Sequence, residues 1–136
     1  MIHLIKLAVG VHGIDHLKAL QRARAEARGE PSIRRAFTRN KPVRPDAADG
    51  SLYWVIKGVI RCRQKLLGFD ADVDQDGRHY CLFRLDPEVV PVMPAQRAAF
   101  QGWRYLEPAD APEDLPSGGE PPADEMIREL KSLGLI

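Results

Sequence analysis

The chain has 136 residues, of which 44% are hydrophobic and 29% charged, which is typical of one soluble globular domain. The formal net charge is only +1, so no global field draws the protein onto nucleic acid or lipid, and any attraction for a polyanion must be local. No apolar run approaches the roughly 18 to 20 residues of a membrane span, and the N-terminus lacks the pattern of a secretion signal, so we expect a cytoplasmic protein without a membrane partner.

The N-terminal part of the chain predicts a strand, a helix and a second strand. Residues 2–9 form a short apolar run rich in branched side chains, which is typical of a buried strand. Over 14–28, apolar residues recur at steps of three and four and a glycine follows, which predicts an amphipathic helix. Residues 32–38 predict a strand, and the proline-containing stretch 42–50 predicts a turn or one short helical turn.

The middle of the chain predicts a hairpin of long strands. The stretch SLYWVIKGVIRCRQKLLGF, residues 51–69, indicates one long or bent strand with Gly58 as a bulge or corner. An acidic tip at 70–78 contains an Asp-Gly turn, and a returning strand follows at 79–87. Residues 88–94 add a short strand that prolines confine to a sheet edge.

The C-terminal part predicts loops and a final helix. Residues 100–108 carry several aromatic side chains without helical periodicity, and 107–122 hold five prolines and two glycines, so both stretches are expected as loops, the second on the surface. Residues 123–134 predict a second amphipathic helix. Its apolar stripe, which we expect to dock on the rest of the fold, comprises Met126, Ile127, Leu130 and Leu133.

This order of elements predicts the fold class. A parallel α/β fold would need a helix between every pair of strands, whereas this chain offers only one such helix, so an α+β fold with a mostly antiparallel sheet is expected. Two helices and five or six short strands favour a half-open β-barrel, which protects strand edges. We expect one domain over residues 1–136.

Metal-binding and cofactor motifs are weak. The acidic tip opens like a calcium loop, with Asp72, Asp74 and Asp76 at alternate positions, but its twelfth position holds Phe83 where such loops have a bidentate glutamate. The four histidines are scattered, and the two cysteines stand singly in strand-like runs, which predicts buried thiols. We therefore predict no metal and no cofactor.

A row of cations is the most suggestive surface feature. Arg61, Arg63 and Lys65 alternate along the predicted strand, which places them on one face with the apolar residues pointing inward. The simplest interpretation is a solvated sheet face. The alternative is a surface for single-stranded RNA or a nucleotide, in which cations bind phosphate and flat rings stack on bases. The candidate residues are Arg61, Arg63, Lys65, Arg39 and Arg104 for phosphate, and Trp54, Trp103 and Tyr105 for stacking.

Three segments of the chain carry a family resemblance: HLIKLAVG, GSLYWVIKGVIRCRQ and FQGWRYLEPADAPEDLP. With them the chain resembles an alphaproteobacterial family of uncharacterised proteins, domain of unknown function fourteen eighty-nine. This resemblance implies a cytoplasmic bacterial protein and supplies no catalytic residue. More distantly, YWVIK followed by GVIRCR is similar to PUA-like barrels, including ASCH and EVE domains, which bind RNA or modified bases. Arg61 stands where the ASCH pattern has a glutamate, two residues before Arg63.

The leading hypothesis is a binding module for RNA or a nucleotide and not an enzyme. Two alternatives remain open: a small enzyme acting on a nucleotide or nucleic acid in the same cleft, and a structural or protein-interaction module whose basic face keeps it soluble. The sequence assigns no catalytic residue, because it shows no phosphate-binding glycine loop, nucleophile elbow or paired carboxylates. It does not predict an oligomeric state.

Overall fold

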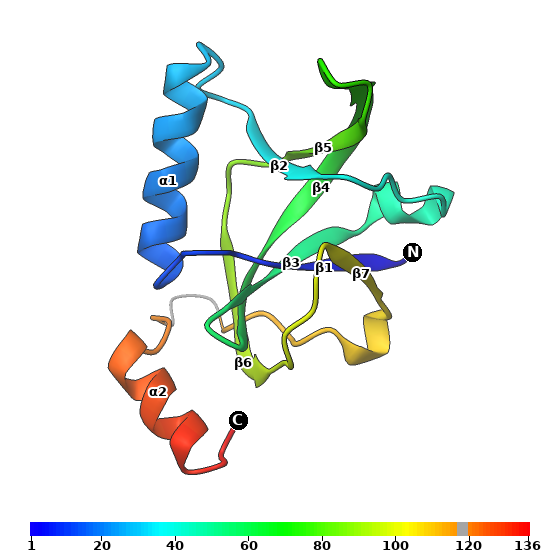
Figure 1. The fold of residues 1–136 in the computed structure, drawn as a ribbon. Coiled ribbons are helices and arrows are strands. Elements are labelled where there is room, and N and C mark those ends of the chain that lie inside the picture. The colour runs from blue at the N-terminus through cyan, green and yellow to red at the C-terminus, as the bar shows by residue number, and fades with distance from the viewer. Residues whose placement is uncertain (117–119) are drawn as a thin grey trace.

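The computed structural model describes residues 1–116 and 120–136. In this part of the chain it contains seven strands and two α-helices, labelled in Figure 1. The strands are β1 (His3–Leu7), β2 (Arg34–Thr38), β3 (Ser51–Ile56), β4 (Val59–Val73), β5 (His79–Leu85), β6 (Val90–Gln96) and β7 (Trp103–Leu106). The helices are α1 (Ile14–Ala27) and α2 (Asp124–Ser132), with short 3-10 helices at Pro45–Asp49 and Pro108–Asp110.

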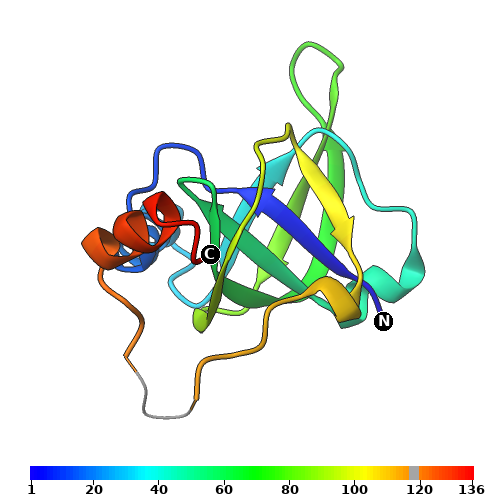
Figure 2. The same cartoon turned by 90° about the horizontal axis from the view of Figure 1, so that it is seen from below.

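The strands form one curled sheet that does not close. Their order is β2-β5-β4-β3-β1-β7, and β6 pairs with β4 beside this path. Only β1 and β3 pair in parallel among the strand pairs of the described residues. The end strands β2 and β7 are not paired with each other, and Figure 2 shows the sheet curving around its interior. This confirms the predicted α+β fold with a mostly antiparallel, half-open barrel.

Strand β4 joins the two halves of the sheet. Its first half pairs with β3 and β6, and its second half pairs with β5. The prediction of one long or bent strand through residues 51–69 with a bulge or corner at Gly58 placed the corner correctly but missed that the chain reverses there, at Lys57 and Gly58, to form the β3–β4 hairpin. Both turn residues have positive φ angles, 50° and 78°, which is the conformation that two-residue hairpins favour.

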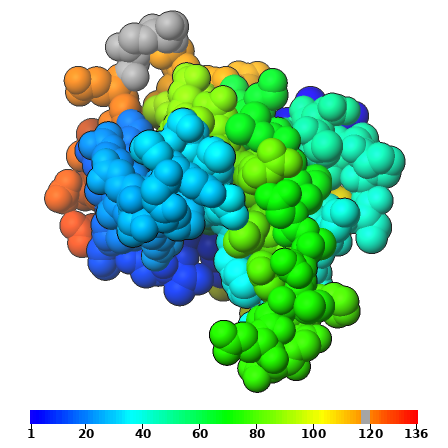
Figure 3. Space-filling view, turned by 90° about the horizontal axis from the view of Figure 1, so that it is seen from above, coloured from blue at the N-terminus to red at the C-terminus, as the bar shows by residue number. Residues whose placement is uncertain are grey.

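The β4–β5 hairpin projects from the body of the molecule (Figure 3). Its turn is organised by Asp74, whose Oδ1 accepts hydrogen bonds from the backbone N–H groups of Asp76 and Arg78 at 2.9 and 3.0 Å. These bonds lower the pKa of Asp74, and the ion pair with Arg39 adds to the effect. The predicted hairpin with an acidic tip is therefore present, with its central carboxylate used to stabilise the turn.

A seventh strand lies where the sequence predicted a loop. Residues Trp103–Leu106 pair antiparallel with β1, so that Trp103 lies opposite Lys6 and Arg104 opposite Ile5. The next residues begin the predicted surface loop at 107–122, of which 117–119 lie outside the described residues. Part of this loop follows β6, since Leu115 N–H donates to the Pro91 carbonyl at 3.0 Å and Met93 N–H to that of Glu113 at 2.8 Å.

The larger hydrophobic core lies between α1 and the concave face of the sheet. It includes Leu4, Trp54, Leu66 and Phe83, while a smaller cluster around Val55 lies on the opposite face. Both cysteines are buried free thiols, as predicted. Burial raises the pKa of the Cys62 thiol to about 12.

Helix α2 docks differently from the prediction. Ile127 is buried, but Met126 and Leu133 are 52% and 64% exposed, so the expected docking of the whole apolar stripe is wrong. Polar contacts hold the helix instead: Lys131 Nζ donates to the Lys57 carbonyl at 3.3 Å, and the carboxylate of Asp124 pairs with Arg61 at 3.0 Å. Of the predicted stripe, Ile127 is thus buried and Leu130 half-buried, while Met126 and Leu133 face solvent. Neither helix is long and apolar enough to cross a membrane in the described part of the chain.

Candidate ligand-binding site

The predicted row of cations on β4 is largely neutralised by carboxylates. Arg61 is only 4% exposed, and its guanidinium donates to Asp124 Oδ1 and to the Pro122 carbonyl, both at 3.0 Å. Arg63 makes a two-pronged ion pair with Asp114 at 2.8 and 2.7 Å. The prediction that all three cations face solvent is therefore wrong for Arg61, which lies beneath the segment that leads into α2.

The ion pair between Arg63 and Asp114 shifts both titrations. The hydrogen bonds raise the pKa of Arg63 and lower the pKa of Asp114. Lys65, in contrast, is exposed, and its side chain has no hydrogen bond or ion pair with any residue that the structure describes. Of the three cations, Lys65 is thus the one that an anion can contact without breaking an ion pair of the described residues.

The predicted stacking residues lie on the other face of the sheet. Trp103 and Tyr105 of β7 pack against the larger core, with their rings 4.8 Å apart in an edge-to-face arrangement. Trp103 Nε1 donates to the Asn40 carbonyl at 2.7 Å, and the Tyr105 hydroxyl accepts the backbone N–H groups of Val43 and Arg44. These bonds tie β7 to the segment after β2 and close part of the barrel opening.

The other two predicted cations lie elsewhere. Arg39 pairs with Asp74 of the hairpin tip at 3.0 Å and stacks over the exposed Phe37 ring. Arg104 lies on the face opposite to Trp103 and stacks over Phe100 at 5.6 Å. The structure therefore does not bring the predicted cations and aromatic residues together in one cleft.

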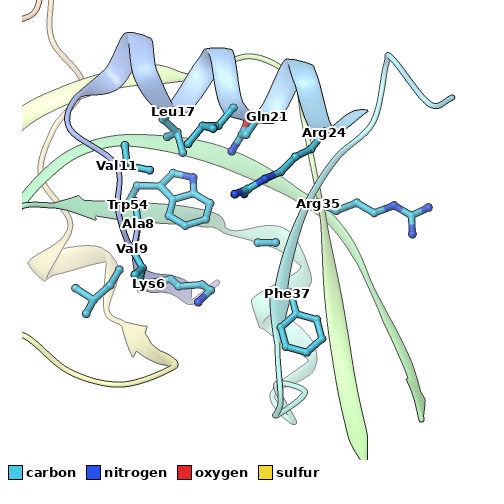
Figure 4. Close-up of a pocket in the computed structure, with 13 residues that line it drawn as sticks. Lys6, Ala8, Val9, Val11, Leu17, Gln21, Arg24, Arg35, Phe37 and Trp54 are labelled. Atoms are coloured by element: carbon cyan, nitrogen blue, oxygen red, sulfur yellow. The ribbon is translucent and has the colours of Figure 1, made fainter. Parts of the chain in front are cut away.

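A different site forms where α1 crosses the opening of the barrel. Because α1 links β1 to β2, which are not neighbours in the sheet, the helix has to span the gap between them. Beneath it lies a cavity of about 270 Å³, which we call the α1 pocket (Figure 4). Its wall is formed chiefly by Lys6 of β1, Leu17, Gln21 and Arg24 of α1, Ala36 of β2 and Trp54 of β3.

A buried amide network supports the pocket wall. Gln64 of β4 is fully buried, and its Oε1 accepts hydrogen bonds from Trp54 Nε1 and Gln21 Nε2, each at 2.8 Å. Its Nε2 donates to Gln21 Oε1 and to the Asp86 carbonyl. Because an indole N–H can only donate, it fixes the orientation of the Gln64 amide, and all hydrogen-bonding positions of that amide are then used. The network holds the Trp54 ring and the Gln21 amide in place.

The α1 pocket is positively charged and lacks a carboxylate among its lining residues. Arg35 at its rim is paired with Glu30 at 2.9 Å. Within residues 1–116 and 120–136, the side chains of Lys6 and Arg24 have neither a hydrogen bond nor an ion pair. Partial burial lowers the pKa of Lys6, because its charged form is desolvated. Figure 4 shows both side chains reaching into the hollow beside Trp54.

Sequence reasoning identified only Trp54 among the residues of this pocket. The cations Lys6 and Arg24 lie in a strand and a helix without any recognisable motif. Two polar residues at core positions were the available signal: Gln21 follows Leu17 on the buried face of α1, and Gln64 lies at an inward position of β4. A buried polar residue is more informative than an exposed one, because burial requires hydrogen-bond partners.

Comparisons with known proteins give a family and one solved structure. A family described as "Protein of unknown function (DUF1489)" matches residues 4–136. No curated protein matches the sequence. A crystal structure of a mutant ZmASCH protein from Zymomonas mobilis is similar over 96% of this chain and 95% of that chain, with 13% sequence identity and a TM-score of 0.46.

Proposed function

This chain belongs to the DUF1489 family of proteins of unknown function, so its role has to be inferred from its own geometry, and we propose that it binds a nucleotide, free or within single-stranded RNA, in the α1 pocket. One observation carries this proposal. The pocket places the Trp54 ring beside two cations, Lys6 and Arg24, that have no carboxylate partner in the described part of the chain.

The charge of the pocket favours an anionic ligand. A partly buried ammonium group without a partner costs free energy, which an anion in the pocket offsets. Lys6 and Arg24 approach the hollow from a strand and from a helix (Figure 4), and we place the phosphate of the ligand between them. Charge-assisted hydrogen bonds of this kind are about twice as strong as neutral ones.

The remaining wall favours a flat, partly apolar group. Leu17, Ala36 and the Trp54 ring provide apolar surface, and Gln21 keeps one N–H and one lone pair that its bonds to Gln64 do not use. A nucleobase combines a flat apolar ring with a polar edge, and aromatic side chains are the usual platform for it. The volume of about 270 Å³ lies just below the roughly 300–1,000 Å³ of small-molecule sites, so we expect a ligand no larger than one nucleotide.

The proposal moves the binding site from β4 to α1. Arg61 and Arg63 would have to give up ion pairs with Asp124 and Asp114 before they could contact phosphate. Lys6 and Arg24 would give up none within the described residues. Lys65 stays a candidate for a peripheral contact with a longer RNA, because it is exposed and unpaired in the part of the chain that the structure describes.

Isothermal titration calorimetry with adenosine 5′-monophosphate, uridine 5′-monophosphate and a short single-stranded RNA tests this proposal. Arg24→Gln and Lys6→Gln should each weaken binding about tenfold or more, since each removes a charge-assisted contact. Lys65→Gln removes the same charge from the opposite face and should leave nucleotide affinity unchanged. If Lys65→Gln weakens nucleotide binding and Arg24→Gln does not, the site lies on β4 and the proposal is wrong.

A further inference from the structure

We infer that the α1 pocket selects a phosphate monoester over a phosphodiester, so that its ligand is a mononucleotide or the phosphorylated end of an RNA. This inference rests on the proposed function, since it concerns the same pocket and specifies which form of nucleotide fits. It follows from the number of unpaired charges in the pocket and not from the presence of positive charge alone.

The charges in the pocket match a dianion. Lys6 and Arg24 are unpaired in the described residues, whereas Arg35 at the rim is held by Glu30 at 2.9 Å. Two unpaired cations and no lining carboxylate leave a charge of +2 to be balanced. A phosphate monoester carries about −1.5 to −2 near pH 7, whereas a diester in the RNA backbone carries one negative charge. Lys6 is half-buried and Arg24 is exposed, and a diester would balance only one of these two charges, whereas a monoester balances both.

The donors in the pocket also suit a terminal phosphate. The Lys6 ammonium group offers three N–H donors and the Arg24 guanidinium offers five, and they reach the hollow from opposite elements (Figure 4). A monoester presents three terminal oxygens to these donors, whereas a diester presents two and carries a second substituent.

Titration of the ligand provides a distinctive test. The lining residues of the α1 pocket include no His, Asp, Glu, Cys or Tyr in the described part of the chain, so Lys6 is the one lining group besides the arginines that titrates. The pKa of Lys6 is lowered, so Lys6 would lose its charge as the pH rises, and this loss would weaken anion binding at higher pH. Affinity that increases between pH 5 and 7.5 must then come from the second ionisation of the phosphate, near pH 6.

The experiment measures binding of adenosine 5′-monophosphate and its methyl phosphodiester by calorimetry at pH 5.0 and pH 7.5. At pH 7.5 the monoester should bind about tenfold tighter, and at pH 5.0 this advantage should fall to about twofold or less, because the monoester has then lost its second charge. Arg24→Gln should remove the preference. Arg22→Gln changes an exposed arginine of the same helix that does not line the pocket, and it should preserve the preference.

Two outcomes separate this inference from the proposed function. If monoester and diester bind equally at both pH values and both lose affinity with Arg24→Gln, the selectivity is refuted while the nucleotide site stands. If neither ligand binds to the wild-type protein, the proposed function itself fails. A four-residue RNA with a 5′-phosphate should bind better than the same RNA with a 5′-hydroxyl, and equal binding of the two would also refute the selectivity. Tighter binding of the phosphorylated RNA than of the mononucleotide would identify an RNA end as the source of the monoester.

Discussion

Replacing Gln64 by leucine should destabilise the fold by about 2–4 kcal/mol, because it leaves polar groups around the α1 pocket without partners. The Trp54 N–H donates to Gln64 Oε1 at 2.8 Å and is buried, so its loss of a partner costs about 1–3 kcal/mol. The Asp86 carbonyl, which accepts from Gln64 at 3.0 Å, belongs to a half-buried residue and adds about 1 kcal/mol. Gln21 is buried too, but it lines the α1 pocket, where water can hydrogen-bond its freed amide, so its amide is left out of this sum.

Urea unfolding followed by circular dichroism at pH 7 measures this change, since the free energy of unfolding falls linearly with urea concentration. Gln101→Leu is the matched control: it makes the same substitution at an exposed position and should change the stability by no more than about 0.5 kcal/mol. The reasoning is refuted if Gln64→Leu loses less than about 1 kcal/mol, because the amide network would then contribute no more than a single ordinary hydrogen bond.

Three further predictions concern other parts of the fold. Arg63 lowers the pKa of Asp114, so this pair stabilises the protein fully above the ordinary carboxyl pKa of about 4, and the stabilisation is lost as the pH falls from there through the lowered pKa. Asp114→Asn should cost roughly 1 kcal/mol at pH 7 and clearly less at pH 2.5 in urea unfolding, and an equal cost at both pH values would contradict the pairing. Removal of residues 121–136 takes away the carboxylate partner of Arg61 and the buried side chain of Ile127, and should lower the melting temperature by several degrees. An unchanged melting temperature would mean that α2 does not dock in solution. The buried Cys62 thiol, with a pKa of about 12, should resist iodoacetamide at pH 8 until urea unfolds the protein, and mass spectrometry would reveal any earlier modification.

The fold class was predictable because hydrophobic periodicity determines which faces are buried. The helix predicted at 14–28 is present at Ile14–Ala27, and the edge strand predicted at 88–94 is β6 (Val90–Gln96). The corner at Gly58 was predicted, but the full reversal was missed because apolar residues flank it on both sides and lysine rarely adopts a positive φ angle. Strand β7 was missed because four residues are too few to show an alternating pattern.

The candidate site was less predictable than the fold, because its properties depend on contacts between distant segments. Alternation predicts Arg61 and Arg63 on one face of β4, but a register shift between Ile60 and Cys62 interrupts the alternation at Arg61. The carboxylates that neutralise the two arginines lie 63 and 51 residues downstream. These carboxylates follow or flank a proline-rich stretch without periodicity, so nothing local connects them to β4. The α1 pocket arises from topology, since it exists only because α1 joins two strands that are not neighbours in the sheet.

The two tryptophans allow the most direct test of the proposed site. In a ¹⁵N–¹H correlation spectrum, their indole N–H signals report on two separate places: Trp54 is bonded to Gln64 at the α1 pocket, and Trp103 is bonded to the Asn40 carbonyl at β7. Titration with adenosine 5′-monophosphate should shift the Trp54 signal together with the backbone amides of Gln21 and Arg24, and leave Trp103 unchanged. Shifts confined to Arg63, Lys65 and their neighbours on β4, with Trp54 unmoved, would place the ligand on the opposite face of the sheet and contradict the account.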